Sequence, residues 1–278
     1  MRIGAMRIDP IIDGEVLGDP GFTYPGVSAS EVIKYQDLLD PITGAFIQTL
    51  GGYLIRYDDR VVVVDAGVGS SPVFPMTGGG FRSSLIALGV KVDDVTDVLL
   101  THLHMDHIGW VTQNGKPYFP NATIRVDKRD WEHFVTSGRE LADWELAMSH
   151  PEEDSAPARL APIEDKLEFW EGDGPIIPGI DAIDAAGHTP GTTVMQLSSN
   201  GERGFLLGDL AHTQPELLNG WTFIVHEDPE RAVQSVVTIR NRLADEQIPC
   251  AAAHFPGLRW GKVVREGDEY TWVDLKEQ

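Results

Sequence analysis

Hydrophobic and polar positions along the chain predict strands and helices in mixed order. Residues 53–57 (YLIRY) and 60–64 (RVVVV) flank Asp58-Asp59, a pattern that predicts a β-hairpin. The run of four valines is too apolar for a strand with one solvated face, so we expect it to be buried on both faces. Residues 65–67 (DAG) then end this strand in a tight turn.

The rest of the chain alternates between predicted strands and helices. The clearest helix covers residues 229–244, where Val233, Val236 and Ile239 recur at roughly helical spacing. Because the elements alternate but a hairpin is also present, we expect an α/β (α+β) fold with a mixed sheet and helices outside it. The other predicted strands are 95–101, 123–126, 192–197, 204–207, 249–255 and 270–275, and the other predicted helices are 83–88 and 130–136.

We expect a single domain over residues 1–278. Two stretches within it depart from the alternation of strands and helices. Residues 1–47 are treated as an N-terminal extension, because they are turn-rich and give no assignable element before residue 46. Residues 139–184 hold thirteen acids, three bases and five prolines. That composition predicts an acidic insertion or lid rather than core.

Charge and composition narrow the classes of function. The chain of 278 residues carries 22 basic and 43 acidic side chains, a net charge of −21. Nucleic acids and anionic membranes would both be repelled, so neither is expected as a partner. A hydrophobic fraction of 42 % argues against disorder. With one cysteine, no N-terminal apolar leader and no stretch of ~20 apolar residues, we expect a cytoplasmic protein.

The densest chemistry lies in residues 101–109 (THLHMDHIG), directly after a predicted buried strand. His102 and His104 are two residues apart, so in extended backbone both side chains point the same way. Asp106 and His107 follow where the chain turns toward a helix. Imidazole and carboxylate are preferred ligands of zinc and similar ions. Four such groups in six residues are hard to explain by packing, because each buried polar group would need its own partner.

Three further residues share this position at strand ends in Gly- or Pro-containing turns. They are His188 (AGHTPG), Asp209 (LLGD) and His254 (AAHFPG). Each alone could equally be a cap, a turn former or a hydrogen-bonded core side chain. Together, seven ligand-type residues at successive strand ends describe one rim of a sheet, where α/β folds place their sites.

This set of motifs, over roughly residues 48–257, resembles the metallo-β-lactamase superfamily. The resemblance implies a four-layer αββα sandwich with two mixed sheets and a metal centre at one edge of the sheets. It also implies two divalent ions, Zn²⁺ before Mn²⁺, Fe²⁺ or Co²⁺. The implied ligands form two groups and a bridge: His102, His104 and His188 for the first metal, Asp106, His107 and His254 for the second, and Asp209 between them.

The implied activity is a metal-dependent hydrolase in which a metal-bridging hydroxide attacks an electrophilic carbon or phosphorus. Asp106 and Asp209 offset part of the metal charge and are counted as catalytic. His212 follows the bridging aspartate by three residues, where quorum-quenching lactonases carry a tyrosine. We expect it to donate a proton or hydrogen bond to the developing oxyanion, with a solvated loop histidine as the alternative.

The branch of the superfamily that this chain looks like is that of the lactonases and methyl parathion hydrolases. His104 stands where the flavodiiron branch has Glu, and true β-lactamases lack an equivalent of Asp209. Only 24 residues follow His254, too few for the glutathione-binding region of glyoxalase II. The net charge disfavours the RNA-processing branch.

We therefore expect an esterase-like lactonase that opens lactones or cleaves carboxylic esters, acting on a small neutral substrate. The alternatives are an organophosphate phosphotriesterase and, in another class, a non-catalytic metal-binding member of the family. A homodimer is left open.

Several other residues have a predicted role in or near the site. Asp65 is read either as a turn former or as a carboxylate that orients a metal-binding histidine. His133, His150 and His226 are read as surface or structural, and Cys250 as an inert buried thiol. Six aromatic residues are candidates for the substrate pocket, with core packing as the alternative: Phe22, Phe46, Trp110, Trp144, Trp221 and Phe223.

Overall fold

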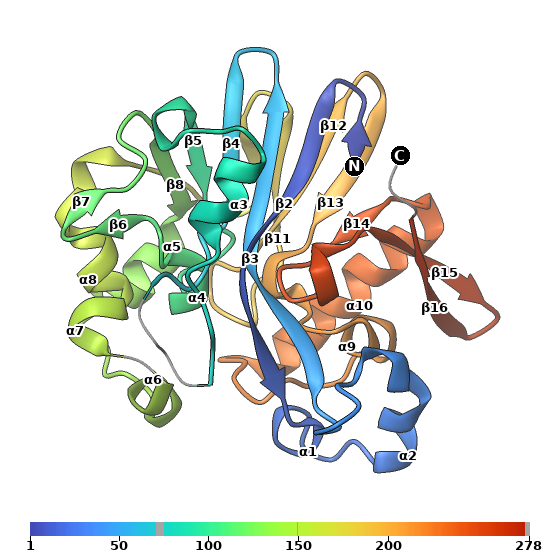
Figure 1. The fold of residues 1–278 in the computed structure, drawn as a ribbon. Coiled ribbons are helices and arrows are strands. Elements are labelled where there is room, and N and C mark those ends of the chain that lie inside the picture. The colour runs from blue at the N-terminus through green and yellow to red at the C-terminus, as the bar shows by residue number, and fades with distance from the viewer. Residues whose placement is uncertain (71–74, 149, 276–278) are drawn as a thin grey trace.

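A computed structural model describes residues 1–70, 75–148 and 150–275 (Figure 1). Two seven-stranded mixed sheets pack against each other, with helices outside them. The first sheet has the order β1 (Arg2–Ile3), β2 (Met6–Gly18), β3 (Phe46–Tyr57), β4 (Arg60–Val64), β5 (Asp97–Leu99), β8 (Thr123–Asp127) and β9 (Leu167–Trp170). The second has the order β10 (Gly174–Ile177), β11 (Ile180–Asp184), β12 (Thr193–Ser199), β13 (Glu202–Leu206), β14 (Cys250–Ala251), β15 (Gly261–Glu266) and β16 (Glu269–Asp274).

The helices are mostly short and lie outside the sheets or in the loops at their edges. A small hairpin of β6 (Thr112–Gln113) and β7 (Lys116–Pro117) lies apart from both sheets. The α-helices are α1 (Pro20–Thr23), α2 (Ala29–Val32), α3 (Phe81–Ala87), α4 (Met105–Ile108), α5 (Lys128–Trp131), α6 (Asp143–Met148), α7 (Pro151–Asp154), α8 (Ala156–Leu160), α9 (Gln214–Asn219) and α10 (Pro229–Glu246).

Three hydrophobic clusters define four layers. One joins the outer face of the first sheet to α3, α5 and α8, and another joins the outer face of the second sheet to α9 and α10. The third lies between the sheets, where Val62 and Leu99 meet Met195 and Leu206. The expected αββα sandwich is therefore confirmed. No helix in the described part of the chain combines the length and apolarity that a membrane crossing needs.

The predicted hairpin forms from β3 and β4, which pair antiparallel around Asp58. Val63 packs in the outer cluster, whereas Val62 and Val64 pack between the sheets. The valine run is thus buried on both faces, as its composition predicts. β4 then pairs in parallel with β5, and the parallel ladder continues through β8 to β9.

Residues 1–47 and 139–184 contribute strands to the two sheets, which the sequence does not predict. β2 pairs with β3 from Arg7 to Gly18, so much of residues 1–47 forms part of the first sheet. In the acidic stretch, α6 to α8 lie outside the sheets, but β9 extends the first sheet and β10 and β11 form the edge of the second. The predicted strand at 249–255 is shorter, because only Cys250 and Ala251 pair.

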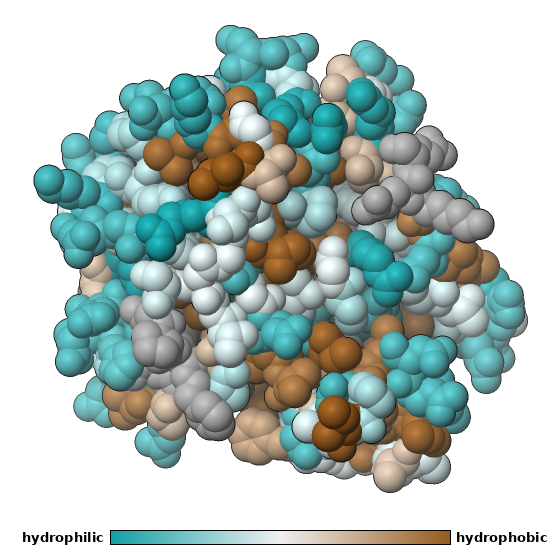
Figure 2. Space-filling model, viewed as in Figure 1, coloured by the Kyte–Doolittle hydropathy of each residue, from teal (hydrophilic) through white to brown (hydrophobic). Residues whose placement is uncertain are grey.

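The surface is mostly polar, as the high net charge predicts, but the N-terminal segment exposes several apolar side chains. Figure 2 shows a largely hydrophilic face with several hydrophobic patches, one of them low on the face over the region of α1 and α2. Phe22 and Ile42 are among the exposed apolar residues of this segment. Leu17 is also exposed, at the end of β2.

Asp13 holds the loop before α3 against the first sheet. It occupies a bulge in β2, where the register with β3 shifts between Ile12 and Gly14, and it is almost completely buried. A buried carboxylate has about four acceptor positions, and here both oxygens are used. The donors are the backbone N–H groups of Val68, Gly69, Gly79 and Phe81 and the indole N–H of Trp110.

Replacing Asp13 by Asn should destabilise the protein strongly. The amide keeps one acceptor oxygen and adds donors that face other donors, so several buried N–H groups lose their partner at about 1–3 kcal/mol each. We expect the melting temperature to fall by roughly 5–10 °C in a thermal unfolding scan. The exposed Asp37→Asn is the control and should stay close to wild type. An Asp13→Asn protein as stable as that control would contradict this role.

Candidate metal centre

Seven histidine and aspartate side chains meet where the strands of both sheets end at one edge. His102 and His104 follow β5, and Asp106 and His107 lie in the short helix α4. His188 lies between β11 and β12, Asp209 in the turn after β13, and His254 in the loop after β14. All seven are at most 9 % exposed. The structure therefore brings together every residue that the sequence predicts as a metal ligand.

One group of ligand atoms comprises three imidazole nitrogens and a carboxylate oxygen. His104 Nδ1 lies 3.0 Å from His102 Nε2 and 2.9 Å from His188 Nε2. Asp209 Oδ2 lies 3.3 Å from His188 Nε2 and 3.6 Å from His102 Nε2. Four ligands placed tetrahedrally about 2.0–2.2 Å from a zinc ion would be separated by roughly 3.3–3.6 Å. The spacing of these atoms thus suits a single cation.

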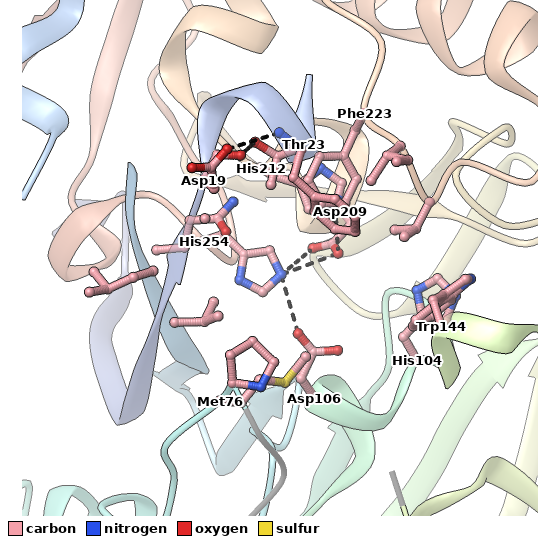
Figure 3. A pocket seen from close by; sticks show the side chains of 18 of the residues that line it. Asp19, Thr23, Met76, His104, Asp106, Trp144, Asp209, His212, Phe223 and His254 are labelled. Atoms are coloured by element: carbon pink, nitrogen blue, oxygen red, sulfur yellow. Dashed lines mark hydrogen bonds and ion pairs between the residues drawn. The ribbon is translucent and has the colours of Figure 1, made fainter. Parts of the chain in front are cut away.

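A second group lies on the other side of the Asp209 carboxylate. Asp209 Oδ1 is 3.3 Å from His107 Nε2 and 3.2 Å from His254 Nε2. Asp106 Oδ2 completes this group at 3.8 Å from His107 Nε2 and 3.5 Å from His254 Nε2. Figure 3 shows His254 facing both carboxylates. His254 Nε2 also lies 3.2 Å from Asp209 Oδ2, so the Asp209 carboxylate contacts ligand atoms of both groups and is placed to bridge two ions.

The polar atoms of this cluster fit a pair of cations better than they fit one another. His107 Nε2 and Asp209 Oδ1 are buried without a hydrogen-bond partner, a costly state unless another group satisfies them. Burial lowers the pKa of His102 and His104 well below the usual value and that of His188 to about 3. These imidazoles are therefore neutral, which is the form that binds metal.

Residues around the cluster fix the orientation of the ligands. Asp65, at a left-handed φ of 60° in the turn after β4, accepts hydrogen bonds from the backbone N–H and hydroxyl of Thr101. Its Oδ2 lies 3.0 Å from His107 Nδ1. The carbonyl oxygen of Thr49 lies 3.1 Å from His254 Nδ1. Each contact engages the ring nitrogen that faces away from the ligand cluster, an arrangement that fixes both tautomer and ring direction.

Asp130 ties two ligand loops together and was not singled out by its sequence context. It is fully buried and accepts hydrogen bonds from the backbone N–H of Leu103 and of Gly191 and from the hydroxyl of Thr189. Burial raises the pKa of Asp130 to about 7, although these donated bonds oppose the shift. The segment of His102 and His104 is thereby joined to the loop that carries His188.

His212 is buried beside Asp209, so it is not a solvated loop residue. Its Nε2 lies 3.2 Å from Asp209 Oδ2, and its ring stacks on Phe223 with centroids 3.6 Å apart. Glu216, fully buried, lies 3.2 Å from His212 Nδ1 and accepts a hydrogen bond from the His212 backbone N–H. Burial lowers the pKa of His212, but the charges of Glu216 and Asp209 outweigh that effect and raise it to about 10 before any cation is counted.

Glu216 and His226 are site residues that sequence reasoning missed. Glu216 Oε1 lies 3.3 Å from His226 Nε2, and His226 Nδ1 lies 3.1 Å from His188 Nδ1. His226 is therefore buried next to a ligand histidine rather than at the surface. The sequence does contain one signal for Glu216, the spacing T-x-x-E, which is typical of the first turn of a helix. In the structure the Thr213 hydroxyl caps α9 by accepting a hydrogen bond from the Glu216 backbone N–H.

A cavity of about 240 Å³ opens onto this cluster. Phe22, Trp144 and Phe223 line it, as predicted, and Trp144 packs edge-on against His104. Figure 3 shows Trp144 beside His104, and Phe223 with His212 above Asp209. Apolar side chains form most of the remaining wall, including Val16, Leu17, Met76, Ile224 and Val225.

Three of the predicted pocket aromatics do not line this cavity. Trp110 is fully buried, stacks on Phe81 and donates its indole N–H to Asp13. Phe46 and Trp221 pack around Tyr24 in a separate cluster below the sheet edge. Their contribution is to the core, which is the commoner role of large aromatic side chains.

The chain matches a known protein family and several known proteins. The family model described as metallo-beta-lactamase superfamily matches residues 52–251. An N-acyl homoserine lactonase of Bacillus thuringiensis is 24 % identical over 213 residues, covering 70 % of this chain and 76 % of that protein.

Two solved structures have the same fold. One is AidC, a dizinc quorum-quenching lactonase, with a TM-score of 0.85. The other is the hydrolase AbOPH, with a TM-score of 0.87. Each is 23 % identical to this chain, and each alignment covers 100 % of this chain and 97 % of the other.

Proposed function

The chain belongs to the metallo-β-lactamase superfamily, and we propose that it is a dinuclear metal-dependent hydrolase that opens small neutral lactones. The observation that carries the proposal is Asp209, whose carboxylate contacts both groups of ligand atoms at the floor of an apolar cavity. The family match and the lactonases among the similar proteins support it.

We assign the first metal to His102, His104 and His188, the second to Asp106, His107 and His254, and the bridge to Asp209. Zinc is proposed for both positions, because nitrogen and carboxylate donors suit it and a similar structure is described as dizinc. When bound, such a pair supplies Lewis acidity and lowers the pKa of water at the site. Asp106 and Asp209 offset part of the added positive charge.

The cavity favours a neutral substrate with apolar parts. Its wall is mainly hydrophobic, and none of its described lining residues is a lysine or arginine that would pair with an anionic substrate. The lining carboxylates and the net charge of −21 would repel an anion. Closure of the apolar wall around the reacting carbonyl would also exclude bulk water and strengthen the polar interactions inside.

His212 is proposed to act on the oxygen that gains charge or leaves during ring opening. It lines the cavity next to Asp209, and Glu216 and Phe223 hold its ring in one orientation. A donor so placed stabilises charge as it develops, without reorganising at the moment of reaction. We propose a cytoplasmic location, and the homodimer and a lid in residues 139–184 remain predictions.

The function is tested by turnover of three substrate classes by metal-loaded protein. We expect kcat/KM for γ-butyrolactones with an apolar substituent to exceed that for aryl esters and phosphotriesters, because the cavity combines apolar walls with a confined polar floor. Rates are followed by proton release for the lactones and by chromophore release for the others. Dominant phosphotriester turnover, or no hydrolysis by protein with two metals bound, would refute the assignment.

His212→Phe should lower lactone kcat by about 100-fold or more, the usual contribution of one positioned acid or hydrogen-bond donor. Metal content by elemental analysis should stay at the wild-type value, since His212 lies beside the ligand groups and is not assigned to either. His133→Phe is the matched control, because His133 is bonded to Glu227 and does not line the cavity. A fully active His212→Phe enzyme would exclude the role.

A further inference from the structure

A buried carboxylate outside the ligand set collects contacts from two sides of the metal centre. Glu216 is fully buried at the start of α9 and is not one of the residues that line the cavity. Four groups that can donate approach its two oxygens: the Tyr24 hydroxyl, the His212 backbone N–H, His212 Nδ1 and His226 Nε2. A carboxylate accepts about four hydrogen bonds and donates none, so it suits these surroundings where a carboxamide would not.

The start of α9 and the N-terminal segment fix the direction of this carboxylate. The Thr213 hydroxyl accepts a hydrogen bond from the Glu216 backbone N–H and lies 2.8 Å from the Tyr24 hydroxyl. The Tyr24 hydroxyl in turn donates to Glu216 Oε2 over 3.0 Å. Tyr24 is fully buried and packs edge-on against Phe46 and Trp221. The Glu216 head group is therefore held by side chains that have little room to move.

One branch of these contacts leads to His212. Glu216 Oε2 lies 2.7 Å from the His212 backbone nitrogen and 3.2 Å from its Nδ1, while Phe223 stacks on the face of the ring. Because Nδ1 is directed at Glu216, Nε2 is the ring nitrogen that faces Asp209, at 3.2 Å, beside the cavity. Glu216 thus decides which edge of the His212 imidazole is presented to a substrate.

The other branch leads to His188, a ligand assigned to the first metal. His188 Nε2 faces the ligand group, 3.3 Å from Asp209 Oδ2, so the metal-binding form of this neutral ring carries its proton on Nδ1. That proton points at His226 Nδ1, 3.1 Å away, which must accept it and so leaves the His226 proton on Nε2.

The proton of His226 needs an acceptor in turn. His226 Nε2 is buried and makes no regular hydrogen bond to the described residues, and Glu216 Oε1 lies 3.3 Å from it, within ion-pair distance. A buried N–H without any acceptor is costly. The order of protons from His188 through His226 is therefore consistent with an acceptor-only group at its end, and Glu216 is that group.

We propose that Glu216 is a positioning residue that acts on turnover through His212 and on the first metal through His226 and His188. The shortest contacts of His212 are to Oε2, whereas His226 lies against Oε1, so one carboxylate serves both branches. The His212 branch rests on the proposed function. The His226 branch concerns metal affinity alone and can be tested without it.

Glu216→Gln tests the first branch, because a carboxamide keeps the shape of the side chain but turns a donor toward groups that donate. In zinc-loaded protein, lactone kcat should fall about 10–100-fold while KM changes less than about twofold. This loss should not add to that of His212→Phe in the double variant, since Glu216 acts through His212. Glu227→Gln is the matched control and should behave as wild type, because Glu227 is partly exposed and pairs with His133.

Zinc affinity, measured by competition with a chromogenic chelator, tests the second branch without turnover. Glu216→Gln should weaken zinc binding about tenfold or more at one of the two sites. His226→Phe should weaken it by a similar factor, and both changes together should weaken it no further than either alone. Unchanged zinc affinity in either variant, unchanged kcat in Glu216→Gln, or a kcat loss that adds to that of His212→Phe would overturn the proposal.

Ring-nitrogen NMR of zinc-loaded wild type gives a readout that needs no substitution of a buried residue. The spectra should show the His188 proton on Nδ1 and the His226 proton on Nε2. A proton on His226 Nδ1 would overturn the proposal even if no Glu216 variant folds. If wild type hydrolyses no lactone, the proposed function fails, and the zinc affinities and these spectra decide the role of Glu216.

Discussion

The close approach of buried imidazole nitrogens and carboxylate oxygens is the constraint on which the rest of this structure depends. Within each group their ligand atoms lie 2.9–3.8 Å apart, and two of them, His107 Nε2 and Asp209 Oδ1, have no hydrogen-bond partner. Such an arrangement costs free energy in the absence of cations and is held together only by the scaffold around it. Three buried carboxylates provide that support: Asp13 fixes the loop before α3, Asp65 aligns Thr101 with His107, and Asp130 joins the loops of His104 and His188.

The meeting of these seven side chains could be predicted from sequence because they share a local signature. Four lie within six residues, and the other three each follow a strand in a turn with Gly or Pro. The supporting residues have no such signature. Glu216 and His226 acquire their roles only when α9 and the loop before α10 pack beside His188, and Trp110 is withdrawn into the core by its bond to Asp13. Contacts of this kind depend on tertiary packing that periodicity does not encode.

Some strands could be predicted from sequence and others could not. The valine run of β4 is uniformly apolar because it is buried on both faces, and its prediction is confirmed. β2 was missed because Pro10 and Gly14 interrupt it and the bulge at Asp13 breaks the alternation of its side chains. That irregularity positions Asp13, and the end of the same strand reaches the cavity. The segment hardest to read from sequence therefore contributes Val16, Leu17 and Gly18 to the cavity wall.

The most direct test of the account is a titration of lactone hydrolysis against metal added to metal-free protein. If Asp209 bridges two ions, activity should rise to a plateau at two bound equivalents per chain, with Zn²⁺ content measured on the same samples. Asp209→Asn should not reach that plateau at the metal concentrations that bring wild type to its plateau. Full activity at one equivalent, or two bound equivalents without lactone hydrolysis, would contradict the dinuclear account.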